Sequence, residues 1–232
     1  MAASSLSALR ARIIGCRACP RLVRHREAVA ARPPRRYQGQ GYWARPLPGF
    51  GDPEARLLIV GLAPAAHGGN RTGRMFTGDG SGQWLARALY EAGFASRPTS
   101  LHVGDGFALT DAYITAAVRC APPGNKPTPR EMARCQPYLE AELALLTHVR
   151  VVVALGRIAF DAFLRAREAR GRPGLRPKPR FAHGAAARLP EGVTLICSYH
   201  PSQQNTFTGK LTRPMLSAVF KKARRLLRSS AG

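Results

Sequence analysis

The sequence predicts an α/β fold in which helices cover both faces of a four-stranded parallel sheet. Two observations predict it: short runs rich in Val, Ile and Leu recur along the chain, and segments with helical periodicity lie between them. Strands that alternate with helices form parallel sheets, because each helix returns the chain to the same edge of the sheet. With 232 residues and 45% apolar content, the chain is expected to form a single domain spanning residues 1–232.

The expected elements follow one another along the chain. The segment 6–14 is predicted to be a helix. The expected strands are 56–61, 112–118, 149–155 and 193–199. The helices expected between and after them are 82–92, 129–146, 158–167 and 213–227. Ligands bind at the carboxyl ends of the strands in such sheets, so the loops that follow the strands are the expected place for a functional site.

Two segments crowded with Arg, Pro and Gly are predicted to be loops: residues 31–51 and 171–180. The first contains Tyr42 and Trp43 among basic residues. It could stack on bases or sugars, or pack its aromatic side chains onto the domain as an ordinary surface loop. The second has almost nothing to bury and could be disordered.

The charge of the chain indicates a polyanionic partner. Lys and Arg number 36 against 13 acidic residues, which gives a formal net charge of +23. Such self-repulsion is usually tolerated for a phosphate-binding surface, although an arginine-rich coding bias is an alternative explanation. The sequence shows neither an export signal nor a run long enough to span a bilayer, and nothing in it demands a partner chain. We therefore expect a monomer of the cytoplasm that binds nucleic acid and no membrane.

Five cysteines, an odd number, argue against a disulfide framework in a chain without an export signal. Cys16 and Cys19 form a C-x2-C pair, Cys120 follows a predicted strand, and Cys135 lies within the next predicted helix. Four thiolates can hold either a tetrahedral zinc ion or an iron-sulfur cluster, and sequence spacing does not separate the two. Cys197, inside the last predicted strand, is expected to be an inert core residue.

Five motifs in order along the chain carry a family resemblance. They are the Cys16/Cys19 pair, Gly61-Leu62-Ala63-Pro64-Ala65, Phe76-Thr77-Gly78-Asp79, the Cys120-to-Cys135 unit with Pro122-Pro123-Gly124-Asn125, and His200-Pro201-Ser202. Together they resemble the uracil-DNA glycosylase superfamily and, within it, the broad-specificity family 5 (type B) enzymes. The resemblance implies a three-layer α/β/α sandwich around a four-stranded parallel sheet. It also implies an enzyme that removes uracil and related damaged bases from DNA.

The resemblance favours iron over zinc at the cysteines. In related thermostable families a 4Fe-4S cluster is held by cysteines placed like Cys16, Cys19, Cys120 and Cys135. The role of the cluster there is structural, because the reaction is a hydrolysis and needs no electron. In this chain the cluster would join the N-terminal helix to the loop after the second strand.

The resemblance also assigns roles in a pocket for a flipped-out base. Phe76 would form a flat apolar wall for the base, and His200 would donate a hydrogen bond to the base O2 as the leaving base becomes anionic. Asp79 is the nearest acid in the loops that could position or activate water. Each also has a structural alternative: a core position for Phe76, a structural histidine for His200, and a cap on the following helix for Asp79.

Small residues stand where better-known relatives carry larger polar ones. Aligned on Gly61, the chain has Ala63 in place of an Asp that assists water attack and Ala65 in place of a Tyr that excludes 5-methyl bases. Ala116 replaces an Asn that reads the edge of uracil in family 4. We therefore expect a wide pocket that accepts uracil, 5-hydroxymethyluracil, hypoxanthine and ethenocytosine.

The amide that replaces the missing Asn is expected to come from Asn125, with Asn70 as the second candidate, although either could only satisfy a turn. Asn205, in the loop after the last strand, is expected to contact the substrate. The segment 202–210 would press into the minor groove with Phe207 as an apolar wedge. A surface loop that leads into a helix could hold the same residues.

Two other function classes stay open at this point. A non-catalytic, basic nucleic-acid-binding protein with a zinc or cluster site is supported by Ala63, since the usual carboxylate is missing. A redox sensor that uses the cluster as a switch is less well supported, because the four proposed ligands leave only Cys197. Release of free uracil from an oligonucleotide distinguishes an enzyme from a binding module.

Overall fold

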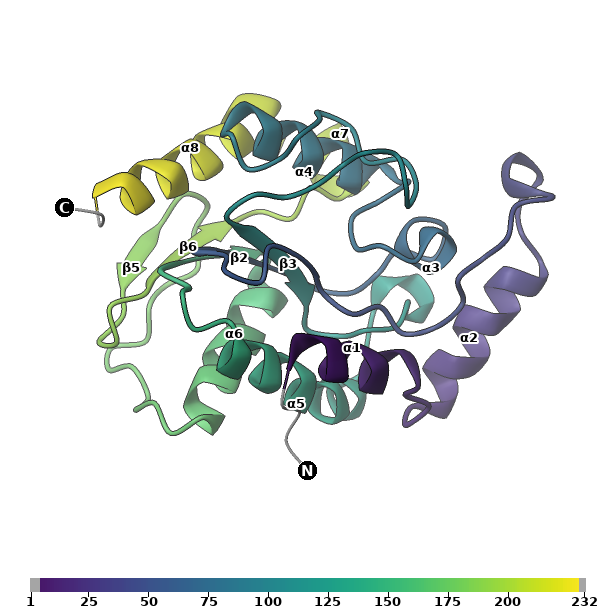
Figure 1. The fold of residues 1–232 in the computed structure, drawn as a ribbon, viewed down its shortest axis with the longest axis horizontal. Helices are drawn as coiled ribbons and strands as arrows, with labels where there is room; N and C mark the ends of the chain where they lie inside the picture. The colour runs from purple at the N-terminus through teal and green to yellow at the C-terminus, as the bar shows by residue number, and fades with distance from the viewer. Residues whose placement is uncertain (1–4, 230–232) are drawn as a thin grey trace.

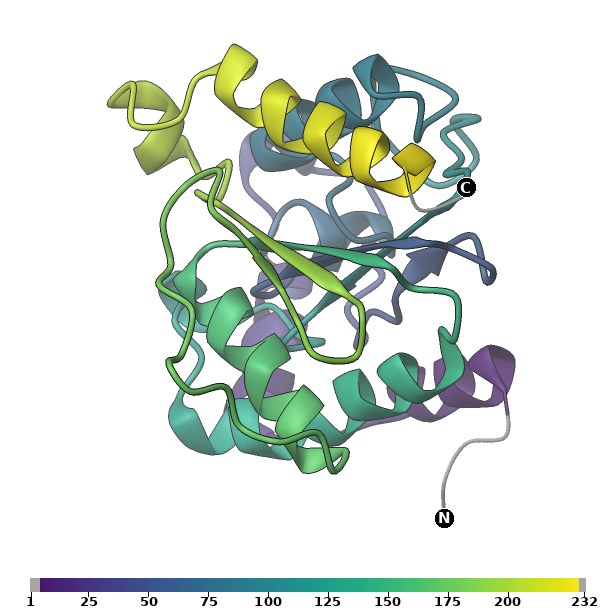
Figure 2. The ribbon, with the colours of Figure 1, turned by 90° about the vertical axis from the view of Figure 1, so that its left-hand side faces the viewer.

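The computed structural model describes residues 5–229 and has the expected three layers (Figure 1). Helices α4 (Gly80–Glu91) and α8 (Arg213–Ser229) cover one face of the sheet. Helices α1 (Leu6–Ile14), α5 (Pro129–Leu145) and α6 (Arg157–Ala169) lie on the opposite side, and Figure 2 shows the sheet between the two layers. The predicted α/β/α fold is confirmed, and the ends of these helices differ from the expected ones by at most two residues.

The sheet contains a parallel core that matches the predicted strands. Its strand order is β1-β3-β2-β4-β6-β5. The parallel strands are β3 (Ala112–Ala116), β2 (Leu57–Gly61), β4 (Val151–Leu155) and β6 (Thr194–Ser198). Every residue of these strands is buried, as expected for strands covered on both faces.

Two short antiparallel strands extend this core to six strands, so the expectation of a sheet with only four strands is corrected. Strand β1 (Phe50–Gly51) pairs with β3, and β5 (Ala186–Arg188) pairs with β6. Neither has an apolar run, because β1 is two residues long and β5 is not buried on either side. Gly51 has a φ of 136°, and a Cβ there would overlap the carbonyl of Ala112, so β1 can approach β3 only with glycine at this position.

The structure also contains elements that the apolar pattern does not predict. Helix α2 (Pro20–Ala31) begins directly after Cys19, with a proline at its first position. The remaining short elements are η1 (Arg35–Tyr37), α3 (Gly69–Thr72), η2 (Pro123–Asn125) and α7 (Gln203–Phe207). The segment 31–51 is therefore not a plain loop, since it includes the end of α2, η1 and β1. The segment 171–180 has no regular structure, as expected.

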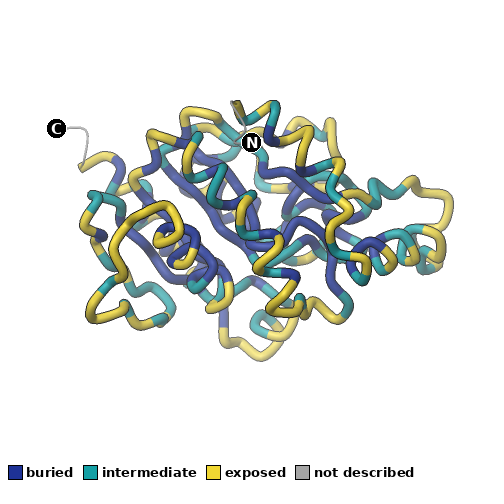
Figure 3. The backbone as a smooth tube through the Cα atoms, turned by 90° about the horizontal axis from the view of Figure 1, so that it is seen from below, coloured by how far each residue is buried: buried dark blue, intermediate teal, exposed yellow. Residues whose placement is uncertain are grey.

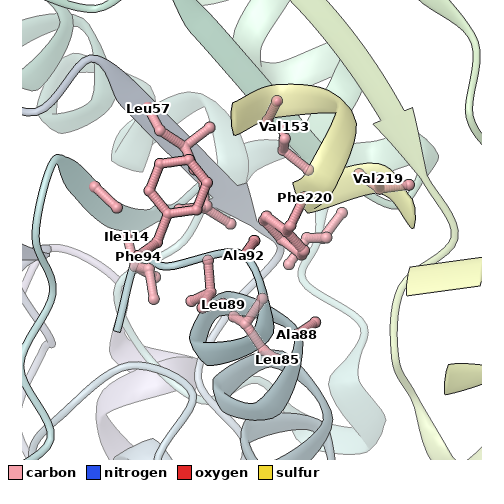
Figure 4. Packing of buried hydrophobic residues seen from close by; sticks show 14 of the residues in the cluster. Leu57, Leu85, Ala88, Leu89, Ala92, Phe94, Ile114, Val153, Val219 and Phe220 are labelled. Atoms are coloured by element: carbon pink, nitrogen blue, oxygen red, sulfur yellow. The ribbon is translucent and has the colours of Figure 1, made fainter. Parts of the chain in front are cut away.

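Two apolar clusters hold the helices to the sheet. Figure 4 shows the first, in which Leu89 and Phe220 of the helical layer lie beside Leu57 and Val153 of the sheet. The second cluster, on the opposite face, includes Phe160. Full burial of one such side chain stabilises the fold by about 1.5–3 kcal/mol. Figure 3 shows this buried interior surrounded by exposed loops, and the rigid sheet fixes where the loops begin.

In the part of the chain that the structure describes, no helix is both long enough and apolar enough to cross a membrane.

Candidate active site and thiol cluster

Residues from two distant segments meet at the carboxyl end of the sheet. Gly61 ends β2, and a Cβ added to it would lie only 2.8 Å from Cε2 of Phe76, so the phenyl ring covers the backbone at this point. The rings of Phe76 and His200 have centroids 5.9 Å apart and are inclined by 36°. Phe76 has a φ of 50°, an uncommon conformation for a bulky residue that marks sites held by their surroundings. Phe76 is half-buried rather than a core residue, which favours its predicted role as a wall.

His200 follows β6 and is held through its backbone. Its carbonyl oxygen accepts a hydrogen bond from the side-chain NH2 of Asn205 at 2.8 Å and another from the backbone N–H of Ser202 at 2.8 Å. Burial lowers the pKa of His200 to about 4. The imidazole is therefore neutral at pH 7 and carries one N–H donor. Asn205 is placed to orient His200, while a contact between Asn205 and the substrate stays a prediction.

Asp79 is the N-cap of α4, so the alternative role as a cap on the following helix is confirmed. Its Oδ1 accepts the backbone N–H of Gly82 at 2.8 Å. Burial raises the pKa of Asp79, although hydrogen bonds from Gly82 and Ser81 and the charge of Arg71 oppose this. The cap uses one carboxylate oxygen, and Oδ2 lies against Gly68 in the same loop. Capping and a role at a reaction centre are therefore compatible.

A network that the sequence did not reveal supports the loop between Phe76 and Asp79. The guanidinium of Arg74 donates to Asp105 and to Ser100, at 2.9 and 3.0 Å. The hydroxyls of Thr77 and Ser100 are 2.7 Å apart and buried. These contacts fix the backbone two residues before Asp79. Their partners are 23 to 31 residues apart in the sequence, without a repeating pattern that could have indicated them.

The other predicted pocket residues lie in different surroundings. The carbonyl of Ala65 accepts backbone N–H groups from Gly68 and Asn70, at 3.3 and 3.1 Å. Ala63 is half-buried against the apolar residues around the thiols. Asn70 is completely buried and donates to a backbone carbonyl, so its amide is not available to a base. Asn125 is exposed at the end of η2 with a φ of 57°, and its contact with a base stays a prediction.

The aromatic residues of the segment 31–51 pack against the domain. The indole N–H of Trp43 donates to the carbonyl of Pro46, and the ring packs against the core. The hydroxyl of Tyr42 lies 2.9 Å from Nδ1 of His67, in the loop after β2. These two side chains therefore anchor the segment 31–51 to the domain.

Exposed residues surround the predicted wedge after β6. Phe207, on α7, is 82% exposed. The ammonium of Lys210 lies 5.0 Å from the ring centre of Tyr199, and the guanidinium of Arg213 lies 5.5 Å from that of Trp84. An exposed apolar ring followed along the chain by two cations has the composition expected of a DNA-contacting loop.

Four thiols line one cavity between the N-terminal segment and α5, and we call them the thiol cluster. They belong to Cys16, Cys19, Cys120 and Cys135. The guanidinium of Arg26 donates to Sγ of Cys120 at 2.9 Å, and the backbone N–H of Arg119 donates to Sγ of Cys135 at 3.3 Å. Burial raises the pKa of Cys120 to about 11 and that of Cys135 to about 12. Cys197 is buried within β6, as expected for a core residue, and all five thiols are free.

Comparisons with known proteins identify the family. A family model of the uracil DNA glycosylase superfamily matches residues 48–227. A type-5 uracil-DNA glycosylase of Thermus thermophilus is 56% identical over 92% of this chain and 94% of its own length. One of Mycobacterium tuberculosis is 53% identical over 97% of this chain and 82% of its own length. A type-4 uracil-DNA glycosylase of Pyrobaculum aerophilum is 31% identical over 78% of this chain and 81% of its own length.

These similarities confirm the resemblance that the sequence motifs carried, and they confirm an enzyme that hydrolyses N-glycosyl bonds. The chain belongs to the uracil-DNA glycosylase superfamily and, within it, to the type-5 uracil-DNA glycosylases.

Proposed function

We propose that the protein removes uracil from DNA by hydrolysing the N-glycosyl bond between base and deoxyribose, which leaves an abasic site. The observation that carries this proposal is the position of Phe76, over Gly61 and against His200, at the carboxyl ends of β2 and β6. Parallel sheets bind their ligands at this edge. A flipped-out base needs a flat apolar surface for stacking and a donor for its carbonyl oxygen, and these residues can supply both.

His200 stabilises the leaving base. As the C–N bond breaks, its electron pair passes to the base, and negative charge develops on the base O2. The neutral imidazole of His200 donates its N–H to this oxygen, and the hydrogen bond strengthens with the charge. The hydrogen bonds on the His200 carbonyl fix the backbone that carries the ring before the reaction, which limits the reorganisation that the loop needs.

Asp79 acts on the sugar side of the bond. A water molecule attacks C1′ of the deoxyribose, and the carboxylate orients this water and accepts its proton. Burial raises the pKa of Asp79, which makes its carboxylate a stronger base than that of an exposed Asp. Its negative charge also stabilises, by electrostatic attraction, the positive charge that develops on the sugar.

The substrate range extends to 5-hydroxymethyluracil, hypoxanthine and ethenocytosine. Ala116 pairs with Gly61 across β3 and β2, which supports its position at the edge of the pocket. Ala65 has no side chain large enough to exclude a substituent at the 5-position of the base. Discrimination against normal bases then rests on the cost of extruding a well-paired base, which is lowest for mismatched or damaged ones.

Binding of DNA uses the positive charge of the chain. The formal net charge of +23 favours association with a polyanion. Lys210 and Arg213 contact backbone phosphates on either side of the flipped nucleotide. Phe207 enters the minor groove and fills the space that the base leaves.

A 4Fe-4S cluster is held by the thiol cluster. Four thiols around one cavity fit a group that binds each sulfur to its own iron. Within residues 5–229, no three or more His, Cys, Asp or Glu side chains are arranged to hold a single metal ion. The N–H groups of Arg26 and Arg119 that point at the sulfurs suit thiolates that carry negative charge. When bound, the cluster supplies a rigid cross-link between the N-terminal segment and α5.

An assay of base release tests the proposed activity. The protein is incubated with oligonucleotides that contain uracil or one of the other three bases, and the free base is measured by mass spectrometry. We expect free uracil and an alkali-labile abasic site. DNA binding without any base release would contradict the activity and support a non-catalytic binding protein.

Metal analysis of anaerobically purified protein tests the cluster separately. We expect iron and sulfide in a one-to-one ratio and broad visible absorption. Stoichiometric zinc without iron would contradict the proposed cluster and would not bear on the proposed glycosylase activity.

A further inference from the structure

Arg26 of α2 is buried and bonded to the thiol cluster. Only 2% of Arg26 is exposed. Its Nη1 donates to Sγ of Cys120 at 2.9 Å, and its Nη2 donates to the carbonyl of Cys16 at 3.5 Å. Burial of a cation is costly unless an anion lies close by. Both of these hydrogen bonds of the guanidinium go to cysteines of the thiol cluster, so the place of Arg26 depends on that cluster.

The backbone of the same residue is bonded to the loop after β2. Asn70 of α3 is completely buried, and its Nδ2 donates to the carbonyl of Arg26 at 3.2 Å. The backbone N–H of Asn70 donates to the carbonyl of Ala65 at 3.1 Å, and its own carbonyl accepts the N–H of Ala44 at 3.0 Å. Hydrogen bonds and covalent bonds therefore form a continuous path from Cys120 through Arg26 and Asn70 to Ala65.

This path ends where the base pocket is formed. The carbonyl of Ala65 that accepts the Asn70 N–H also accepts the N–H of Gly68 at 3.3 Å. Gly68 in turn borders the carboxylate of Asp79. A shift of Asn70 would consequently move both the residue expected to set the width of the pocket and the backbone beside Asp79. Protein interiors are close-packed, so such shifts are transmitted rather than absorbed.

We propose that Asn70 is a positioning residue that couples the cluster segment, residues 16–26, to the catalytic loop, residues 61–79. It contacts no base and acts through Ala65 and Gly68. The Oδ1 atom of Asn70 has no partner among the described residues, so the N–H donor is the part of its amide that the structure uses. The inference rests on the proposed function, because it assumes that the catalytic loop lines a pocket for a flipped-out base.

Asn70→Ala removes the donor to Arg26 and tests the coupling. We expect kcat for uracil release to fall on the order of tenfold or more, because small misplacements of reacting groups cost that much in rate. KM, DNA affinity and iron content should stay as in the wild type, since the phosphate contacts and the thiols are unchanged. Gln136→Ala is the matched control, because that amide donates within α5, to Glu140. Asn70→Asp keeps the volume of the side chain and replaces the Ala variant if the latter does not fold.

Arg26→Met tests the other end of the path. The Met side chain fills much of the space and lacks the donor to Cys120. We expect the visible absorption of the cluster to disappear several-fold faster under an oxidant or a chelator, because neighbours of metal ligands control how firmly a metal is held. Because both variants break one path, the Arg26→Met/Asn70→Ala double variant should lose little more in kcat than Asn70→Ala alone.

Hydrogen exchange supplies a readout that does not depend on activity. Residues 61–79 should exchange faster in Asn70→Ala than in the wild type, while β4 exchanges at the same rate. An unchanged kcat with unchanged exchange in a folded Asn70→Ala protein would overturn the coupling, and so would fully additive losses in the double variant. A wild type that releases no uracil refutes the proposed function instead, and the exchange experiment then still decides whether Asn70 holds the loop.

Discussion

The carboxylate of Asp79 fills the space that a side chain on Gly68 would need. A Cβ built on Gly68 would overlap Oδ2 of Asp79 and come within 3.0 Å of its Cβ. Oδ1 is meanwhile held by the N–H of Gly82 at 2.8 Å. Residue 68 must therefore lack a side chain if the carboxylate is to keep this orientation.

Gly68→Ala should lower the rate of base release by displacing this carboxylate. We expect a loss on the order of a hundredfold, as for a displacement of about 1 Å near a reaction centre. Single-turnover kinetics on a uracil-containing oligonucleotide measures the loss. Gly41→Ala is the control, because a Cβ there would meet nothing within 4 Å. Equal rates for the two variants would contradict a role for Asp79 in the reaction.

The pH dependence of the rate should report the ionisation of Asp79. Burial raises its pKa, and the carboxylate is the active form, so activity is present above this pKa and lost as pH falls through it. The loss should begin at a higher pH than for an exposed Asp. Asp79→Asn should lower the plateau and remove this acid limb. If the limb persists in Asp79→Asn, another group is responsible, and His200, with a pKa lowered to about 4, is then the first to test.

The four core strands could be predicted because burial on both faces leaves an uninterrupted apolar run in the sequence. Helix α2 could not, because a guanidinium, Arg26, occupies one of its three buried positions and breaks the apolar pattern. Strands β1 and β5 are held by backbone pairing, with few buried side chains to reveal them. Pattern analysis detects side-chain burial and misses elements that are held by other forces.

The same division between predictable and unpredictable features applies to the residues of the candidate site. Short motifs indicated the candidate residues, and the structure brings two of them, Phe76 and His200, together at the carboxyl end of the sheet. The residues that support them could not be predicted, because the Arg74 and Asp105 side chains meet through tertiary structure alone. The close contact between Gly68 and Asp79 could not be predicted either, because a glycine that is needed for its lack of a side chain leaves no pattern in the sequence.

His200→Ala should reduce base release far more than DNA affinity. The hydrogen bond from a neutral His200 is strongest when the leaving base carries negative charge, so its loss raises the barrier without weakening the ground-state complex. Loss of one such donor costs about a hundredfold to a thousandfold in other enzymes. His148→Ala is the control, since His148 is an exposed residue paired with Glu54. An unchanged single-turnover rate would remove His200 from the mechanism.

DNA affinity should fall steeply with salt. Each phosphate contact releases a counterion, so the logarithm of the association constant should fall with log[salt] with a slope of about −0.9 per contact. Lys210→Ala and Arg213→Ala should each make the slope shallower by about one. Arg150→Ala should leave the slope unchanged, because Arg150 precedes β4 and lies at the opposite end of the sheet. Fluorescence anisotropy across a salt titration measures these slopes, and a flat wild-type curve would contradict electrostatic binding.

The width of the base pocket gives the last prediction, which concerns Ala65. The loop around it is fixed by hydrogen bonds on the Ala65 carbonyl, so a larger side chain there has to point into the neighbouring space rather than move the backbone. If this space receives the substituent at the 5-position of the base, the Tyr ring of Ala65→Tyr excludes 5-hydroxymethyluracil and leaves room for uracil. We expect the ratio of kcat/KM for these two bases to change by at least tenfold, as steric exclusion from a tight pocket allows.

The comparison uses single-stranded and duplex oligonucleotides that carry each base. In duplex DNA the rate also includes extrusion of the base, whereas in single strands that cost is small, so only the single-stranded ratio reports the pocket itself. Retained uracil release in Ala65→Tyr serves as the internal control for folding. If the wild type releases uracil alone in both contexts, residues other than Ala65 exclude the bases with a 5-substituent. If the Tyr variant still releases 5-hydroxymethyluracil, residue 65 does not face the 5-position.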